Sequence, residues 1–338
     1  MRARLFSADS AGIGETVPPD HPVVHLIWEV VLLVVAGVFV LVAVAGSHGA
    51  SLAEIFGPVG YVGLIATGLA LSLRTGTPNL AVGNFALFTG VIGVHLVTAD
   101  GWSLWSAMTL AVVITVLIGL VTGVLVAVLS VPAWALTLGI AFLLQSASLG
   151  IIGSAGEELR HPGTYSTALW FVAFVVISAG GGVLWLSPAV RTLFSASRSA
   201  SEPGQWAGLP AGLGAVVGLT GSSLLAGVGG VALALFQRFA DPASDGVGLT
   251  AVAMAAVLVG GVSIFGRRAG VAGTILGVII AESLNVILLV NNFSSSWYYV
   301  PFGLMIVFGL GVNRALESIT DLVNRRRVPS FTAPSVPA

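Results

Sequence analysis

Cysteine and lysine are both absent from this chain, and charged residues of either sign are scarce. Without cysteine the chain has no disulfide framework, no thiolate nucleophile and no cysteine-based metal site. Without lysine it has no phosphate-binding loop of the G-x-x-x-x-G-K-[ST] type, so any nucleotide-driven work would need another polypeptide. The formal net charge of −1 gives no sign of a nucleic-acid partner.

Charged residues are 8% of the 338 residues, whereas a soluble domain carries roughly 25%. Hydrophobic residues are 56% of the chain, and the mean hydropathy is +1.03. Such a chain cannot cover a surface that faces water, so the composition predicts a protein of the lipid bilayer. The 44 glycines suit transmembrane helices that pack closely.

Apolar segments long enough to span the bilayer as helices recur along the whole chain. The ten segments are 26–46, 56–74, 79–98, 104–129, 133–153, 168–187, 208–237, 248–264, 270–291 and 297–316. They predict an all-α, polytopic transmembrane helical bundle. The predicted domains are a cytosolic N-terminal tail (1–25), a transmembrane domain (26–317) and a disordered cytosolic C-terminal tail (318–338).

The arginines predict the orientation of this bundle. With ten spans and the N-terminus inside, 11 of the 13 arginines lie inside, and only Arg160 and Arg238 lie outside. Because loops on the cytosolic side carry the excess of basic residues, both termini are predicted to be cytosolic. The expected location is the plasma membrane, which is the inner membrane in a cell that has two.

The stretch "LRTGTPNLAVGN" interrupts an otherwise apolar region. Thr77 can cap a helix, Pro78 suits a first helical position and Gly76 permits a turn, so the third helix is predicted to begin at Pro78. Asn79 and Asn84 would then lie near a polar permeation path. The alternative is a plain cytosolic turn, because irregular backbone at membrane depth is tolerated only under protein cover or beside a water-filled cavity.

Four polar residues at apolar depth are further candidates for the translocation path: Asn84, Gln145, Glu282 and Asn285. Glu282 and Asn285 are three residues apart and share a helix face. A charge in mid-span is costly and rarely faces lipid. Hydrogen bonds that join helices are the alternative role, and we favour that role for Gln145.

Other chemistry finds little support in the sequence. No pair of histidines has metal-ligand spacing with a carboxylate, and no catalytic grouping stands out, so we expect no metal, no cofactor of the chain's own and no catalytic residue. Trp297, Tyr298 and Tyr299 lie near a span end and are interpreted as interfacial anchors. An intramembrane enzyme is therefore disfavoured.

The longest inside loop, residues 188–210, is the predicted docking site for a soluble subunit. A short amphipathic element there would pass rigid-body motion of that subunit to the bundle. The residues assigned to it are Arg191, Arg198, Glu202, Trp206 and Gly208. A solvated connector is the alternative.

Two tracts echo each other, "TPNLAVGNFALFTGVIG" and "VGLTAVAMAAVLVGGVSIFG", and each follows a polar break. Paired interrupted segments in two halves of a chain point to a transporter's substrate path. Together with "SVPAWALTLGIAFLLQSASLGI" and "GRRAGVAGTILGVIIAESLNVIL", these tracts resemble the membrane permeases of ribose-type ABC importers. That family also includes branched-chain amino-acid and nucleoside permeases, and the likeness covers roughly residues 50–316.

The resemblance implies partners and a function. The partners are a second permease subunit, two cytosolic ABC ATPases that use the ATP, and an extracellular or periplasmic solute-binding protein. Glu202 and Gly208 match the family's ATPase-contacting loop, whereas Pro203-Gly204 departs from it; Asn285 matches a common asparagine, and Glu282 is unusual. The "NLAVG" form favours a sugar as solute, with nucleosides and branched-chain amino acids as alternatives.

Two further classes stay open. An ion-coupled secondary transporter would need ionisable residues along its path, and Glu282 is the only acid in mid-span. A purely structural membrane subunit, such as a divergent half of a permease pair, would associate with a transporter without carrying solute.

Overall fold

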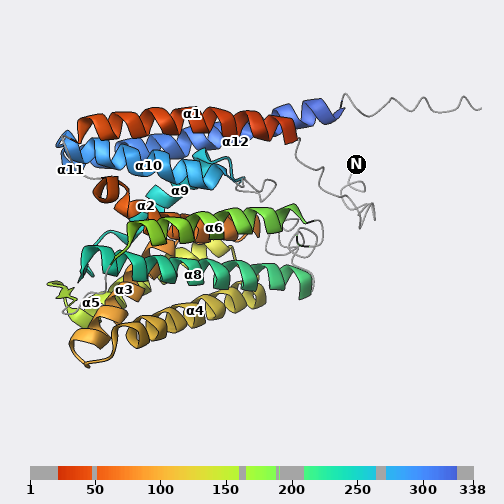
Figure 1. Ribbon diagram of the computed structural model, residues 1–338. Coiled ribbons are helices and arrows are strands. Elements are labelled where there is room, and N and C mark those ends of the chain that lie inside the picture. The colour runs from red at the N-terminus through yellow and green to blue at the C-terminus, as the bar shows by residue number, and fades with distance from the viewer. Residues whose placement is uncertain are drawn as a thin grey trace, which may run out of the picture.

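The computed structural model of the protein describes residues 22–47, 52–159, 165–187, 190, 209–263 and 272–325. Over these residues the chain is helical apart from its connections and one two-stranded antiparallel sheet. The helices are α1 (Pro22–Gly46), α2 (Leu52–Arg74), α3 (Val82–Thr98), α4 (Leu104–Leu129), α5 (Ala133–Ile152), α6 (Thr167–Leu186), α8 (Leu209–Gln237), α9 (Gly246–Val259), α10 (Gly273–Val290), α11 (Ser295–Tyr298) and α12 (Val300–Arg325). The strands are β1 (Glu157–Glu158) and β2 (Phe239–Ala240). The predicted all-α bundle is confirmed, and Figure 1 shows its long helices lying side by side.

Seven helices in the described residues are long and apolar enough to cross a membrane, namely α1, α2, α4, α5, α6, α8 and α10. The apolar helices α3 and α9 and the first part of α12 are shorter. With a rise of 1.5 Å per residue, α3 is about 26 Å long and α9 about 21 Å, less than a hydrocarbon core of roughly 30 Å. Both are also shorter than the predicted spans 79–98 and 248–264.

The prediction that the third helix begins at Pro78 is wrong. Helix α3 begins at Val82, and its N-cap residue, Ala81, makes no side-chain capping hydrogen bond. The hydroxyl of Thr77 instead lies 2.8 Å from that of Thr75. The predicted turn at Gly76 is present, with φ of 73°, a backbone conformation that glycine adopts without steric cost.

Burial divides the helices into an inner and an outer set. In α2, 78% of the spanning window is buried inside the protein, against 17% in α1 and α6. The outer helices expose large apolar side chains, such as Leu41 on α1 and Val128 on α4. These outward side chains suit contact with lipid tails, which are as apolar as leucine.

Helices α3 and α9 meet at their first turns. A Cβ atom on Gly83 would strike the carbonyl oxygen of Gly246 and lie 2.9 Å from the backbone nitrogen of Thr250. Farther along α9, Gly277 of α10 packs against the backbone of Ala256. Only residues without a side chain permit these approaches, as expected for glycines in transmembrane helices that pack closely.

Residues 241–245 lead from the sheet back into the bundle. Strand β1 contacts α3 and pairs with β2, with Glu157 opposite Ala240. His95, near the C-terminal end of α3, contacts Glu157 of β1. Since β2 pairs with β1, β2 also lies near that end of α3. Helix α9, in contrast, begins beside the first turn of α3. The bundle thus contains two irregular segments, the largely buried 75–81 and the partly exposed 241–245, and each precedes a short helix.

Two predicted domain boundaries differ from the helix ends. Helix α12 continues to Arg325. Hydropathy alone did not predict its last turns, because residues 317–325 are largely polar. Helix α1 begins at Pro22, inside the predicted tail. The N-terminal end of α1 and the C-terminal end of α12 lie at one end of the bundle, and α11 lies at the other (Figure 1).

Candidate functional site

The segment between α2 and α3 is buried although it is neither helix nor strand. Thr75, Thr77 and Asn79 each have 0% exposure. The Asn79 side chain donates from Nδ2 to Oγ of Ser222 on α8 (3.1 Å), and its Oδ1 accepts from the backbone N–H of Ala81 (3.0 Å). The segment is therefore not an exposed turn, and Asn79 ties it to α8.

Threonines on two other helices complete the hydrogen bonding of this break. The backbone N–H of Leu80 donates to Oγ1 of Thr137 on α5, and that of Gly83 donates to Oγ1 of Thr250 on α9, each at 3.0 Å. Both hydroxyls also donate to a carbonyl oxygen one turn earlier in their own helices. Because the first N–H groups of a helix have no partner within it, these hydroxyls take the place of a cap.

Asn84 and Gln145 form a second tie between helices. Nδ2 of Asn84 donates to Oε1 of Gln145 at 3.0 Å, and Nε2 of Gln145 donates to the carbonyl oxygen of Pro242. This chain joins α3 and α5 to the irregular segment 241–245. Oδ1 of Asn84 is buried and has no hydrogen-bond partner among the described residues.

A polar cavity of about 200 Å³ lies between α2, α3, α8, α9, α10 and α11. Its apolar wall comes mainly from α2, α3 and α9. Its polar groups come from eight residues: Tyr61, Gln237, Ser244, Asp245, Glu282, Asn285, Tyr298 and Tyr299. A concave site between helices at which several polar groups converge is a common place for a small molecule to bind.

A chain of hydrogen bonds crosses this cavity. Oη of Tyr298 donates to Oδ1 of Asn285 at 2.7 Å, and Nδ2 of Asn285 donates to Oε2 of Glu282 at 3.2 Å. Tyr298 lies in α11, outside the spanning helices, and burial, followed by the nearby Glu282 carboxylate, raises its pKa to about 12. Tyr298 therefore stays a hydrogen-bond donor at neutral pH and fixes the orientation of the Asn285 amide.

The structure brings two of the five predicted path residues together in the cavity, Glu282 and Asn285. Their spacing of three residues placed them on one face, and the contact follows from that spacing. Asn84 and Gln145 bond to each other instead, and Asn79 lies in the break between α2 and α3. A role for these three in the path stays a prediction.

The aromatic part of the cavity wall was not predicted from the sequence. Tyr298 and Tyr299 line the cavity, a position that their interpretation as interfacial anchors did not include. The cause is the four-residue helix α11, which turns the chain before α12 begins at Val300. Tyr61 carried no signal of a binding site in the sequence, because a tyrosine in an apolar helix is indistinguishable from a core residue.

The predicted coupling residues Arg191, Arg198, Glu202, Trp206 and Gly208 lie outside the described residues.

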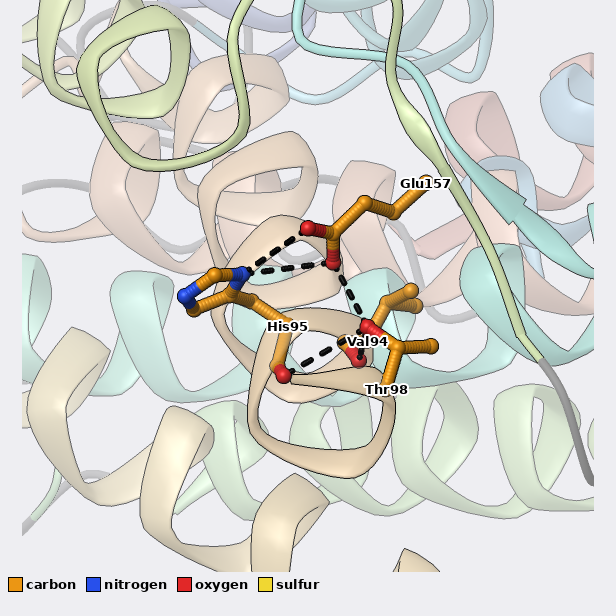
Figure 2. Close-up of polar contacts among 4 residues, drawn as sticks. All are labelled: Val94, His95, Thr98 and Glu157. Atoms are coloured by element: carbon orange, nitrogen blue, oxygen red, sulfur yellow. Dashed lines mark hydrogen bonds and ion pairs between the residues drawn. The ribbon is translucent and has the colours of Figure 1, made fainter. Parts of the chain in front are cut away.

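The sheet is attached to α3 by a second polar cluster. Figure 2 shows Glu157 of β1 above the last turns of α3, with Nδ1 of His95 3.0 Å from its Oε1. Oγ1 of Thr98 donates to Oε2 of Glu157 at 2.7 Å and to the carbonyl oxygen of Val94 at 2.9 Å. No group of three or more His, Asp or Glu with metal-ligand geometry occurs among the described residues. The cluster is a clasp between the sheet and α3.

Short interrupted helices around a polar cavity, inside a bundle of membrane-spanning helices, define the membrane domain of a solute transporter. The comparison with known families gives the same class. Residues 51–310 match the model of the family described as "Branched-chain amino acid transport system / permease component". The match covers most of the chain, and the chain belongs to this family of multi-pass membrane permeases.

Individual relatives are distant in sequence but similar over most of their length. The inner membrane ABC transporter permease protein YjfF of Escherichia coli K12 is 26% identical over 283 residues, which cover 80% of this chain and 84% of the relative. The L-arabinose ABC transporter permease protein AraH of Azospirillum brasilense is 27% identical, covering 72% and 73%. The galactofuranose transporter permease protein YtfT of E. coli K12 is 26% identical, covering 69% and 70%. No solved structure matches.

Proposed function

We propose that this chain is the membrane-spanning permease subunit of an ABC importer and that its solute is a small sugar. Membership of the permease family carries the first part. The second part is supported by relatives named for L-arabinose and galactofuranose. The absence of lysine, and hence of a phosphate-binding loop, fits ATP hydrolysis on a separate subunit.

The proposed orientation has both termini in the cytosol. The arginine distribution supports it, as does the position of the described ends of α1 and α12 at one end of the bundle (Figure 1). The cavity then lies toward the external side, where α11 is found, and an extracellular or periplasmic binding protein would deliver solute there. A second permease subunit completes the membrane unit.

Helix α8 is the proposed connection between ATPase and cavity. It begins at Leu209, next to the proposed coupling loop 188–210, and its last residue, Gln237, lines the cavity. Between these ends, Gly218 of α8 packs against Thr75 and Thr77 of the break. Motion of the loop would thus reach both the start of α3 and the cavity, as alternating access requires.

Transport in whole cells tests this proposal. Glu202→Arg and deletion of 198–204 are expected to abolish sugar uptake while the protein still inserts in the membrane. Asp100→Arg reverses the charge of an acid at the end of α3 and is the matched control, with uptake retained. Normal uptake with both loop variants would contradict the coupling role. If nucleosides or branched-chain amino acids inhibited uptake and sugars did not, the solute would belong to one of those two classes.

A further inference from the structure

The charges around the cavity are of one sign. Two acidic residues, Glu282 and Asp245, line it, and no arginine or histidine is among its described lining residues. Asp245 caps α9, because its Oδ1 accepts from the backbone N–H of Gly248 at 2.8 Å. Asp245 is exposed, so its charge stands at the edge of the cavity.

Glu282 is the buried acid, with 1% exposure. Its Oε2 accepts from Asn285, and no donor to its Oε1 is found within the described part of the chain. A buried carboxylate is costly unless donors satisfy it. A solute that enters the cavity with a hydroxyl group can provide the missing donor, whereas a solute carboxylate or phosphate would add a second negative charge.

The size of the cavity limits the solute. About 200 Å³ equals the liquid volume of roughly seven water molecules, and it is below the roughly 300 Å³ at which pockets for drug-sized ligands begin. Tyr61 and Tyr298 add aromatic surface to the wall. A single sugar ring, with apolar faces and a rim of hydroxyl donors, fits this volume and this lining.

We propose that the cavity is an anion-excluding subsite for neutral monosaccharides, contained within one chain, in which Oε1 of Glu282 accepts a hydroxyl hydrogen bond from the sugar. This inference rests on the proposed importer function and adds a selectivity to it. Sugar acids and sugar phosphates of the same size are disfavoured, because the described lining offers them two acidic side chains and no cationic partner. Few polar contacts are made, so the sugar binds weakly enough to leave.

Direct binding to the purified full-length protein in lipid nanodiscs tests the subsite. Saturation-transfer NMR would be recorded with D-galactose, D-ribose, L-arabinose and D-fructose as neutral probes, and with D-galacturonate as the charged counterpart of galactose. At least one neutral sugar is expected to bind, and galacturonate is expected to give a signal roughly tenfold weaker than galactose, because like charges repel. Equal signals from galactose and galacturonate, or no binding of any neutral sugar, would overturn the proposal.

Variants assign the selectivity to Glu282. Glu282→Gln keeps the shape and removes the charge, so the galacturonate signal should rise to within about twofold of the galactose signal. Glu158→Gln, an exposed acid on β1, is the matched control and should leave the ratio unchanged. A ratio unaltered by Glu282→Gln would refute the role of the carboxylate. If that variant does not fold, Ser244→Trp, in the connection that borders the cavity, should reduce binding of every neutral sugar, and undiminished binding would refute the site.

Uptake separates failure of this inference from failure of the importer function. If cells carrying Ser244→Trp accumulate sugar at the normal rate in an ATP-dependent manner, the cavity is not on the translocation path. That result would refute the subsite and leave the proposed importer function intact. If removing the whole chain leaves uptake of every probe sugar unchanged, the importer proposal falls, whatever the binding measurements give.

Discussion

Many buried hydroxyl groups in the described part of the chain bond within their own helix. Oγ1 of Thr67, Thr89 and Thr115 each donates to the carbonyl oxygen four residues earlier. Ser222 and Thr137 also accept from the break between α2 and α3. The break is thus stabilised by side chains from helices far away in the sequence.

Asn79→Ala tests that view of the break. The change leaves the backbone N–H of Ala81 without its acceptor in a buried position, which costs about 1–3 kcal/mol. Thermal unfolding of the purified protein in detergent should show a clear drop in Tm. The control is Asn291→Ala, whose side chain makes an exposed hydrogen bond to the carbonyl oxygen of Ile287 and should change Tm little. Equal shifts in the two variants would contradict the assignment.

Prediction of single residues from the sequence succeeded where partners are close along the chain. Glu282 and Asn285 are three apart, so helical geometry alone puts them together. Asn84 and Gln145 were recognised as buried polar residues, but 61 positions separate them and nothing in their spacing specifies the contact. The Asn79–Ser222 bond spans 143 positions, and only the folded bundle reveals it.

Helices α3 and α9 are both short apolar helices, and both follow irregular backbone. Their first turns meet at Gly83 and Gly246. Hydropathy located both helices, because their sequences are as apolar as the others. It could not locate the start of α3, because whether residues 78–81 join the helix depends on acceptors supplied by α5 and α9.

Gly83→Ala tests the contact between α3 and α9. The new methyl group would strike the carbonyl oxygen of Gly246, and overpacking of this kind costs about 1–3 kcal/mol. We expect a lower Tm and less monodisperse protein in gel filtration. Gly139→Ala in α5 is the control, since a Cβ there meets nothing within 4 Å, and its Tm should be unchanged or slightly higher. A Gly83→Ala variant as stable as that control would show that the helices do not pack as described.

If the clasp holds the sheet to α3, its loss should make the sheet open more often. Glu157→Ala removes the acceptor for Thr98 and the partner of His95 (Figure 2). Both His95 and Glu157 are partly exposed, so the loss is about 0.5 kcal/mol. Hydrogen exchange should become a few times faster at the Leu159 amide, which donates to the carbonyl oxygen of Arg238 across the sheet. Glu158→Ala is the control, and equal exchange rates in both variants would exclude the clasp.

On the scale of the whole molecule, the described residues contain ten apolar helices, seven of which are long enough to cross a membrane. One end of the bundle carries the described ends of α1 and α12, and the other carries α11 (Figure 1). Composition and arginine placement predicted the bundle and its orientation. The cavity was beyond prediction, because residues from six helices and one connection have to converge to form it.

The chain has no cysteine, so single cysteines can report its orientation without background. Ser103→Cys precedes α4, near the proposed external end, and Ser318→Cys lies in α12, on the proposed cytosolic side; both positions are exposed. A membrane-impermeant maleimide should label the first in intact cells and the second only after the cells are opened. The reverse pattern would invert the orientation and with it the direction of transport.

The central claim is that this permease moves solute only when a separate ATPase drives it. The most direct measurement is sugar uptake into proteoliposomes that contain either the chain alone or the complex isolated with it from native membranes, with and without ATP. We predict uptake by the complex with ATP, its loss with vanadate, and none by the chain alone. Uptake by the chain alone, driven by an ion gradient and indifferent to ATP, would contradict the account.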